Sequence, residues 1–185
     1  MTNPQTKFEL IAALEDLHTG LADTIATMSL TDFERAGTDD RWSPKDYLKH
    51  ILLSVKPIVK ALEMSADKVR KLFPVAEGSS RAYADIVTAY AAGLARGVRA
   101  EDQPSVLPIS YRLPDDMGDE QTYLRGQWDD ALLRLLAALD SWSDHDLDTA
   151  QLPHPAIGLI TMREMLLFTV YHTTMHWNDM RGIHL

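Results

Sequence analysis

Apolar residues recur at helical spacing along almost the whole chain, and this periodicity constrains the fold more than any other feature of the sequence. Between Gln5 and about Met28, leucine and isoleucine fall three or four positions apart, at Leu10, Leu14, Leu17, Leu21 and Ile25. Such spacing places them on one face of an amphipathic helix. No stretch alternates apolar and polar residues for more than a few positions, as a half-buried strand would. The sequence therefore predicts an all-α fold.

The clearest helix start in the chain follows Trp42. Ser43 suits the N-cap position and Pro44 suits the first position of the helix. Trp42 can also pack against Tyr47 as a hydrophobic staple, which fixes the direction from which the chain enters the helix. We expect this helix to run from Pro44 towards Met64.

Further helical patterns cover residues 65–72, 80–96, 119–142 and 161–181. Between them, residues 98–118 hold three prolines and predict a long crossover connection, and residues 147–158 (LDTAQLPHPAIG) are interpreted as a loop. Helices that are neighbours in a simple up-and-down bundle need only short loops, so the long connection predicts a less regular order. The 185 residues suit a single domain spanning 1–185.

Composition narrows the class of function. A net charge of −9 repels phosphate backbones, and no basic run offsets it, so we expect no nucleic-acid partner. The chain has no cysteine, which excludes a thiolate nucleophile and any cysteine-ligated metal. No apolar run approaches the roughly 18 residues that span a bilayer, and the N-terminal segment is acidic where a signal peptide would be apolar. We therefore expect no membrane partner and a cytoplasmic location.

Two histidines four residues apart stand out in the last predicted helix. His172 and His176 form an H-x-x-x-H motif, whose spacing puts both imidazoles on one face of the helix. Met165 and Thr169 share this stripe, which indicates that the rings point inward. Buried imidazole nitrogens need partners, and either a metal ion or hydrogen bonds within the core would supply them. The motif lacks the glutamate of H-E-x-x-H, so a zincin-type protease is not supported.

His50 lies on the predicted helix that begins at Pro44, in a sector separate from the apolar face and from the lysines. Tyr47, Ser54 and Ala61 share this sector. Small and polar side chains of this kind suit the wall of a cleft. The alternative is a histidine on the flank of the helix that faces solvent.

The order and spacing of these features resemble the DinB-like superfamily of four-helix-bundle proteins, over nearly the whole chain. The features are Trp42-Ser43-Pro44 leading to His50, then His154-Pro155-x-x-Gly158-x-x-Thr161-x-x-Glu164, and a last helix with His172 and His176. The resemblance implies a DinB-like four-helix bundle with a long crossover. It also implies a divalent metal, zinc or nickel, bound by one histidine of the second helix and two of the last, which are His50, His172 and His176 here.

The resemblance implies a class of function rather than one reaction. Members include transferases and isomerases that use bacillithiol or mycothiol, and proteins described as metal-dependent hydrolases. We expect a metal-dependent enzyme acting on a small molecule, either by hydrolysis with metal-bound water or by transfer of a low-molecular-weight thiol. The alternative is a non-catalytic metal-binding or dimerisation bundle associated with stress response. The resemblance further implies a homodimer.

Three more residues are candidates for a supporting role. Asp46 lies one turn before His50, and Asp179 lies about one turn beyond His176, so either carboxylate could orient a ligand or act as a base. A helix cap and a surface residue are the alternatives for these two. His154, just before the last helix, either lines the site or caps its own loop.

Overall fold

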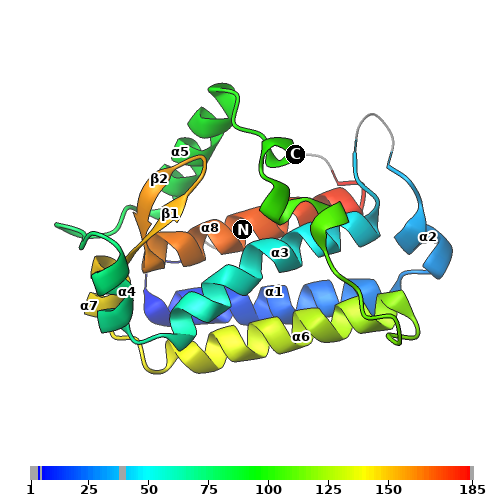
Figure 1. Cartoon of the computed structure of the whole chain (residues 1–185), viewed down its shortest axis with the longest axis horizontal. Helices are drawn as coiled ribbons and strands as arrows, with labels where there is room; N and C mark the ends of the chain where they lie inside the picture. Colours follow the sequence, from blue (N-terminus) through cyan, green and yellow to red (C-terminus); the bar gives the residue numbers. More distant parts are fainter. Residues whose placement is uncertain (1–3, 5, 38–40, 184–185) are drawn as a thin grey trace.

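Four long helices build the bundle. The computed structural model describes residues 4, 6–37 and 41–183, so the predicted helix start at Gln5 lies outside the described residues. The long helices are α1 (Lys7–Thr27), α3 (Pro44–Glu63), α6 (Glu120–Leu139) and α8 (Met162–Met180), shown in Figure 1. α1 and α3 each pack against α6 and α8, so they occupy opposite corners of the bundle. The predicted all-α bundle is confirmed.

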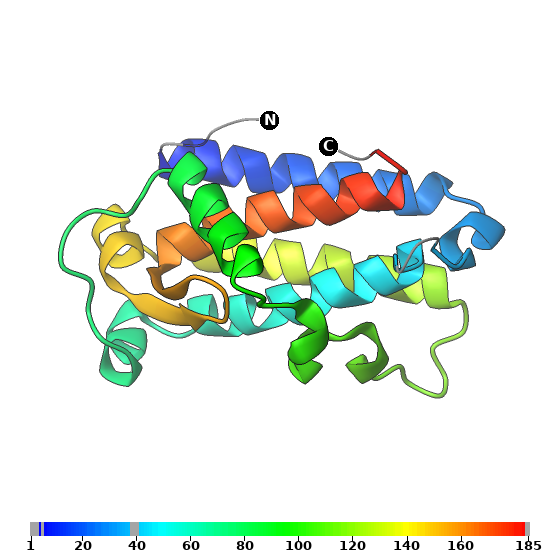
Figure 2. The same ribbon diagram turned by 90° about the horizontal axis from the view of Figure 1, so that it is seen from above.

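Shorter elements fill the connections between the long helices. The short helix α2 (Leu30–Glu34), which the sequence did not predict, follows α1, and α4 (Ala66–Leu72) follows α3. α5 (Tyr83–Ala95) lies against α8, outside the four-helix bundle (Figure 2). The predicted crossover is confirmed as an irregular segment, and it contains the short 3-10 turns η1 (Ala100–Asp102), η2 (Pro104–Val106) and η3 (Pro108–Ser110).

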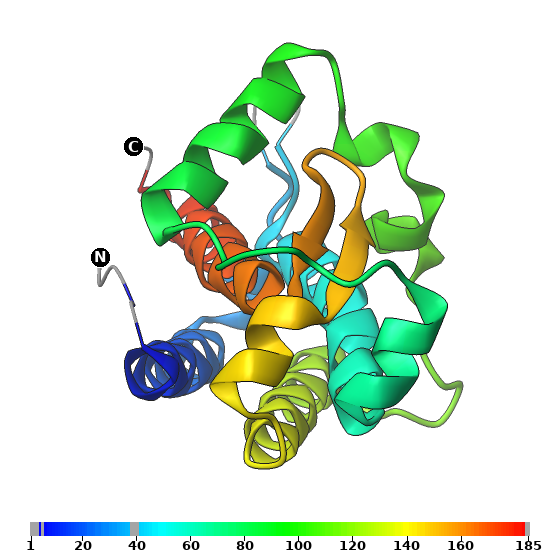
Figure 3. The ribbon, with the colours of Figure 1, turned by 90° about the vertical axis from the view of Figure 1, so that its left-hand side faces the viewer.

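The prediction of a loop over residues 147–158 is wrong. This segment contains the end of α7 (Asp144–Thr149) and the strand β1 (Gln151–His154), which pairs antiparallel with β2 (Gly158–Thr161). Each strand has only four residues, too few for an alternating pattern to become visible in the sequence. A proline within β1 also argued against a strand, but a two-stranded hairpin has only edge strands, where proline is tolerated. The hairpin leans towards α5 at one end of the bundle (Figure 3).

The core lies between the four long helices and is closed by two tryptophans at α6. Trp128 is fully buried, and its indole N–H donates to the backbone oxygen of His18 at 3.1 Å. Trp142 follows α6 and donates to the backbone oxygen of Leu62 at 2.8 Å, at the end of α3. These bonds satisfy the polar atom of each ring without exposing its apolar surface. No helix that the structure describes is long and apolar enough to cross a membrane.

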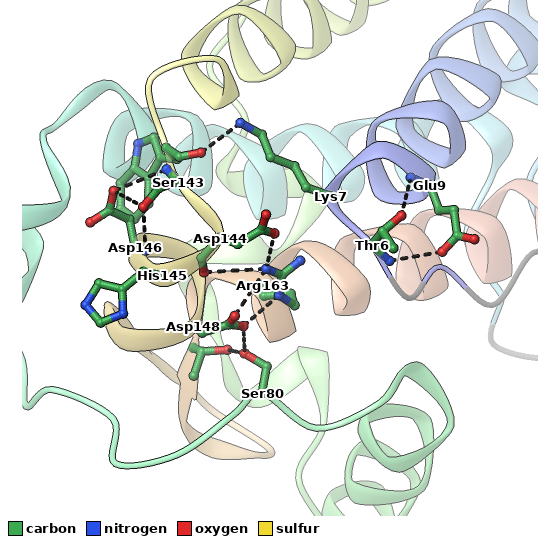
Figure 4. Close-up of polar contacts among 12 residues, drawn as sticks. Thr6, Lys7, Glu9, Ser80, Ser143, Asp144, His145, Asp146, Asp148 and Arg163 are labelled. Atoms are coloured by element: carbon green, nitrogen blue, oxygen red, sulfur yellow. Dashed lines mark hydrogen bonds and ion pairs between the residues drawn. The ribbon is translucent and has the colours of Figure 1, made fainter.

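Ion pairs fix the start of α8 against the elements that precede it. Arg163 donates from Nε to Asp148 Oδ1 and from Nη2 to Asp144 Oδ1, both at 2.6 Å. Ser80 donates to the same Asp148 oxygen at 2.6 Å, which links α7 to the segment before α5 (Figure 4). α8 is thereby held in position at the end opposite His176.

Candidate metal centre

Both helices that carry the candidate ligands begin with strong caps. Ser43 Oγ accepts from the backbone N–H of Asp46 at 3.2 Å, and Trp42 packs edge-on against Tyr47 with ring centroids 5.6 Å apart. The helix start predicted at this point is therefore confirmed. α8 begins with a capping box between Thr161 and Glu164. Because its first turn is fixed, the positions of the side chains further along the helix are fixed too.

The three histidines predicted to meet do so. His50 on α3 reaches across to α8, where its Nε2 lies 3.1 Å from His172 Nε2. His172 Nε2 lies 3.2 Å from His176 Nε2. One ligand nitrogen from each ring falls within 4.8 Å of the other two. His50 and His172 are 2% and 5% exposed, so the solvent-facing alternative for His50 is wrong.

Hydrogen bonds at the outer nitrogens determine which nitrogen of two rings carries the proton. His50 Nδ1 lies 2.7 Å from the backbone oxygen of Val106, and His176 Nδ1 lies 3.2 Å from Asp179 Oδ2. Carbonyl and carboxylate oxygens accept hydrogen bonds, so Nδ1 is the donor in both rings. In the neutral rings, the Nε2 atoms of His50 and His176 therefore carry free electron pairs that face His172.

These nitrogens fit a divalent cation. A neutral His172 ring has one N–H, so it can donate to at most one of the two facing Nε2 atoms. Tetrahedral coordination with metal–nitrogen bonds of about 2.0 to 2.1 Å separates two ligand nitrogens by roughly 3.3 Å, which agrees with the 3.1 and 3.2 Å of the two pairs that include His172. The three ligand nitrogens all lie within 4.8 Å of one another. Burial lowers the pKa of His50 to about 4 and the pKa of His172 well below its ordinary value. Both rings are therefore neutral near pH 7, as metal ligands must be.

The cluster lies on the wall of a cavity of about 630 Å³. Aromatic rings surround it: Trp42 is 4.8 Å from His50, and Phe168 stacks on His172 at 5.0 Å between ring centroids. Most other lining side chains are apolar, and they come from α3, α5, α8, the hairpin and the crossover. A cation held by the three imidazoles would thus face a space that can hold a small molecule.

The two candidate carboxylates have different positions. Asp179 contacts His176 Nδ1, the position of a residue that orients a ligand. Asp46 instead accepts from Ser43 Oγ at 2.7 Å at the start of α3, and it does not line the cavity. Among the described residues, the ligand cluster contains no fourth histidine or carboxylate. A cation held by these three nitrogens would therefore have a position left for a further ligand.

Neither the Val106 carbonyl nor the aromatic wall from α5 could be predicted from the sequence. A backbone oxygen carries no residue-type signal, and Val106 is 56 positions away from His50 in the chain. Tyr90 lies 6.4 Å from His172 between ring centroids. Its helix was predicted, but its placement over α8 was not, because the rest of the α5 sequence is rich in alanine and shows no strong apolar stripe.

We expect acid to destabilise the metal-free protein. Burial lowers the pKa of His154 to about 4, so between pH 6.5 and 4 this imidazole binds more protons in the unfolded chain than in the folded one. Stability then falls as the pH falls through this window, by up to about 3 kcal/mol for this imidazole. Urea unfolding in the presence of a chelator, from pH 7 to 4.5, measures the effect. The free energy of unfolding should depend less on pH in His154→Asn. An unchanged dependence would contradict the lowered pKa of His154.

Comparison with known families supports the assignment of the fold. A family model described as the DinB superfamily matches residues 38–180, which include all three histidines of the cluster. Searches of curated proteins and of solved structures found no match.

Proposed function

Because the chain belongs to the DinB superfamily, we propose that it is a metal-dependent enzyme in which His50, His172 and His176 hold a divalent cation, zinc or nickel. The observation that carries this proposal is the arrangement of electron pairs. Two neutral rings, oriented by outer hydrogen bonds, direct Nε2 towards the third ring, and both pairs that include His172 have the separation of two nitrogens bound to one cation. The open side of the cluster faces the cavity, which favours an enzyme over a non-catalytic bundle.

The protein's own residues prepare the site for a small substrate. Asp179 and the Val106 carbonyl each hold a ligand ring in one orientation and keep its proton on Nδ1. Trp42 and Tyr47 pack against the imidazoles and limit the access of bulk water. When bound, a cation here supplies Lewis acidity to a hydrolytic water or to a thiol.

The cavity favours thiol transfer over hydrolysis. Hydrolysis requires a base near the reacting water, yet none of the described residues that line the cavity is acidic, and Asp179 already contacts His176. A low-molecular-weight thiol would release its proton to solvent on binding a metal, so the step needs neither a protein base nor a protein nucleophile, which suits a chain without cysteine. We therefore propose that a thiolate sulfur forms a bond to an electrophilic carbon, from which the leaving group departs with its electron pair. Hydrolysis is the second candidate.

An assay of the zinc-loaded and nickel-loaded protein tests this function. Low-molecular-weight thiols, including bacillithiol and mycothiol, are mixed with chlorodinitrobenzene and related electrophiles, beside a panel of esters and amides. We expect conjugation that disappears in His176→Ala and persists in His145→Ala, because His145 is an exposed histidine outside the cluster. Activity in neither panel, or activity that survives the loss of His176, would instead support the non-catalytic bundle.

A further inference from the structure

A fourth histidine, His154, faces the same cavity from the hairpin. It ends β1, and its Nδ1 accepts two backbone hydrogen bonds, from Ala156 N and Ile157 N, both at 3.2 Å. A nitrogen that accepts from two N–H groups carries no proton of its own. The neutral ring therefore has its proton on Nε2, so the turn presents a hydrogen-bond donor of fixed identity.

Within the described part of the chain, this donor has no partner. No described residue accepts a hydrogen bond from His154 Nε2, and the atom is not among the sealed, unpaired polar atoms of the core. The ring contacts Phe168 at 4.3 Å between centroids, and Phe168 in turn stacks on His172. His154 and the histidine cluster thus lie on one cavity wall, separated by a single phenyl ring. A molecule of modest size can reach both at once.

The charges on the cavity wall indicate what kind of molecule fits. The whole chain has a net charge of −9, yet the described residues lining the cavity include two arginines, Arg41 and Arg99, and no carboxylate. A cationic ligand would find no counter-charge there. A ligand whose polar atoms are hydrogen-bond acceptors would instead meet an N–H donor, within walls that are otherwise mostly apolar.

We propose that His154 Nε2–H binds the substrate, and that the substrate is an apolar molecule with a carbonyl-type acceptor, placed over Phe168 between His154 and the histidine cluster. This inference rests on the proposed function only in taking the cavity as the substrate site. His154 then has two roles, because one nitrogen shapes the turn and the other selects the ligand.

Two probes and two variants test the proposal. Acetophenone and α-methylstyrene have nearly the same shape and differ in a carbonyl oxygen against a methylene group, so the ratio of their dissociation constants reports a donor in the cavity. His154→Asn keeps an acceptor near the position of Nδ1, because an asparagine side chain can accept from the backbone N–H two residues further along. The variant lacks the part of the ring that carries Nε2. Leu94→Ala is the matched control, because it enlarges the cavity from α5 without touching a donor.

We expect NMR titration of the full chain to show that His154→Asn lowers the preference for acetophenone about three- to tenfold relative to the native protein, the range of one hydrogen bond. Leu94→Ala should weaken both probes alike. An unchanged preference in His154→Asn, or no binding of either probe to the native protein, would overturn the proposal. The same titrations in the presence of zinc and of a chelator test this inference separately from the metal site, because binding of the probes requires no turnover. If the native protein binds the probes but not zinc, the proposed function is contradicted and this inference stands.

Discussion

Zinc is expected to raise the melting temperature of the native protein and to leave that of His172→Ala unchanged. His172 is the middle ligand, since its Nε2 lies within 3.2 Å of the Nε2 atoms of both other rings. Zinc at 100 times its dissociation constant stabilises a folded protein by about 2.7 kcal/mol. For a chain of this length, that corresponds to a rise of roughly 5 to 10 °C. Loss of a ligand should weaken binding more than 100-fold, because loss of an orienting residue alone costs 10- to 100-fold.

Calorimetry with zinc and with a chelator measures this difference. His145→Ala is the control, because this variant also loses a histidine but keeps the cluster intact. Metal analysis of the dialysed proteins should give about one equivalent for the native chain and for the control. A full zinc-induced shift in His172→Ala would show that the metal binds elsewhere.

Trp128→Ala is expected to destabilise the metal-free protein by roughly 3 to 5 kcal/mol. Trp128 is fully buried on α6, which packs against both α1 and α3. Its replacement removes a large apolar contact and leaves a cavity that the surrounding helices can fill only in part. Because small proteins are stable by only about 5 to 15 kcal/mol, much of the total would be lost. Urea unfolding followed by circular dichroism gives the free energy of unfolding directly.

Trp128→Phe separates packing from hydrogen bonding. This variant keeps most of the apolar ring but leaves the backbone oxygen of His18 without its indole donor. Because His18 lies inside α1, this oxygen still accepts its helical hydrogen bond. Losing one hydrogen bond costs roughly 0.5 to 1.5 kcal/mol, so the loss should be clearly smaller than in the alanine variant. A loss of less than about 1 kcal/mol for Trp128→Ala would contradict the packing described here.

The long helices could be predicted from the sequence because their own residues determine them. The leucine stripe of α1 and the Ser43–Pro44 start of α3 are local signals that packing then reinforces. The β1–β2 hairpin could not be predicted, because its strands are short and its stability depends on contacts with α7 and α8. The position of α5 could not be predicted either, because it depends on the surface of α8 against which it packs.

The candidate site, too, could be predicted only in part from the sequence. The spacing of His172 and His176 indicates a shared helix face, but nothing in the local sequence of His50 says that it crosses to α8. The resemblance to the DinB-like superfamily supplied that link, and the structure confirms the convergence. The proton positions on the rings required the fold itself, because the acceptor at His50 is a backbone carbonyl from a distant segment.

The hydrogen bond from His50 to Val106 sets limits on how this protein can be engineered. Connections between helices usually tolerate insertions and deletions well, and the proline-rich crossover would be an obvious place to shorten the chain or to graft a tag. Here a deletion near η2 would remove the acceptor of a candidate ligand and let its ring rotate. Sequence changes around Val106 are therefore expected to disturb the site as changes at the histidines would. In the described structure, the contact with the cluster comes from the Val106 backbone and not from a side chain.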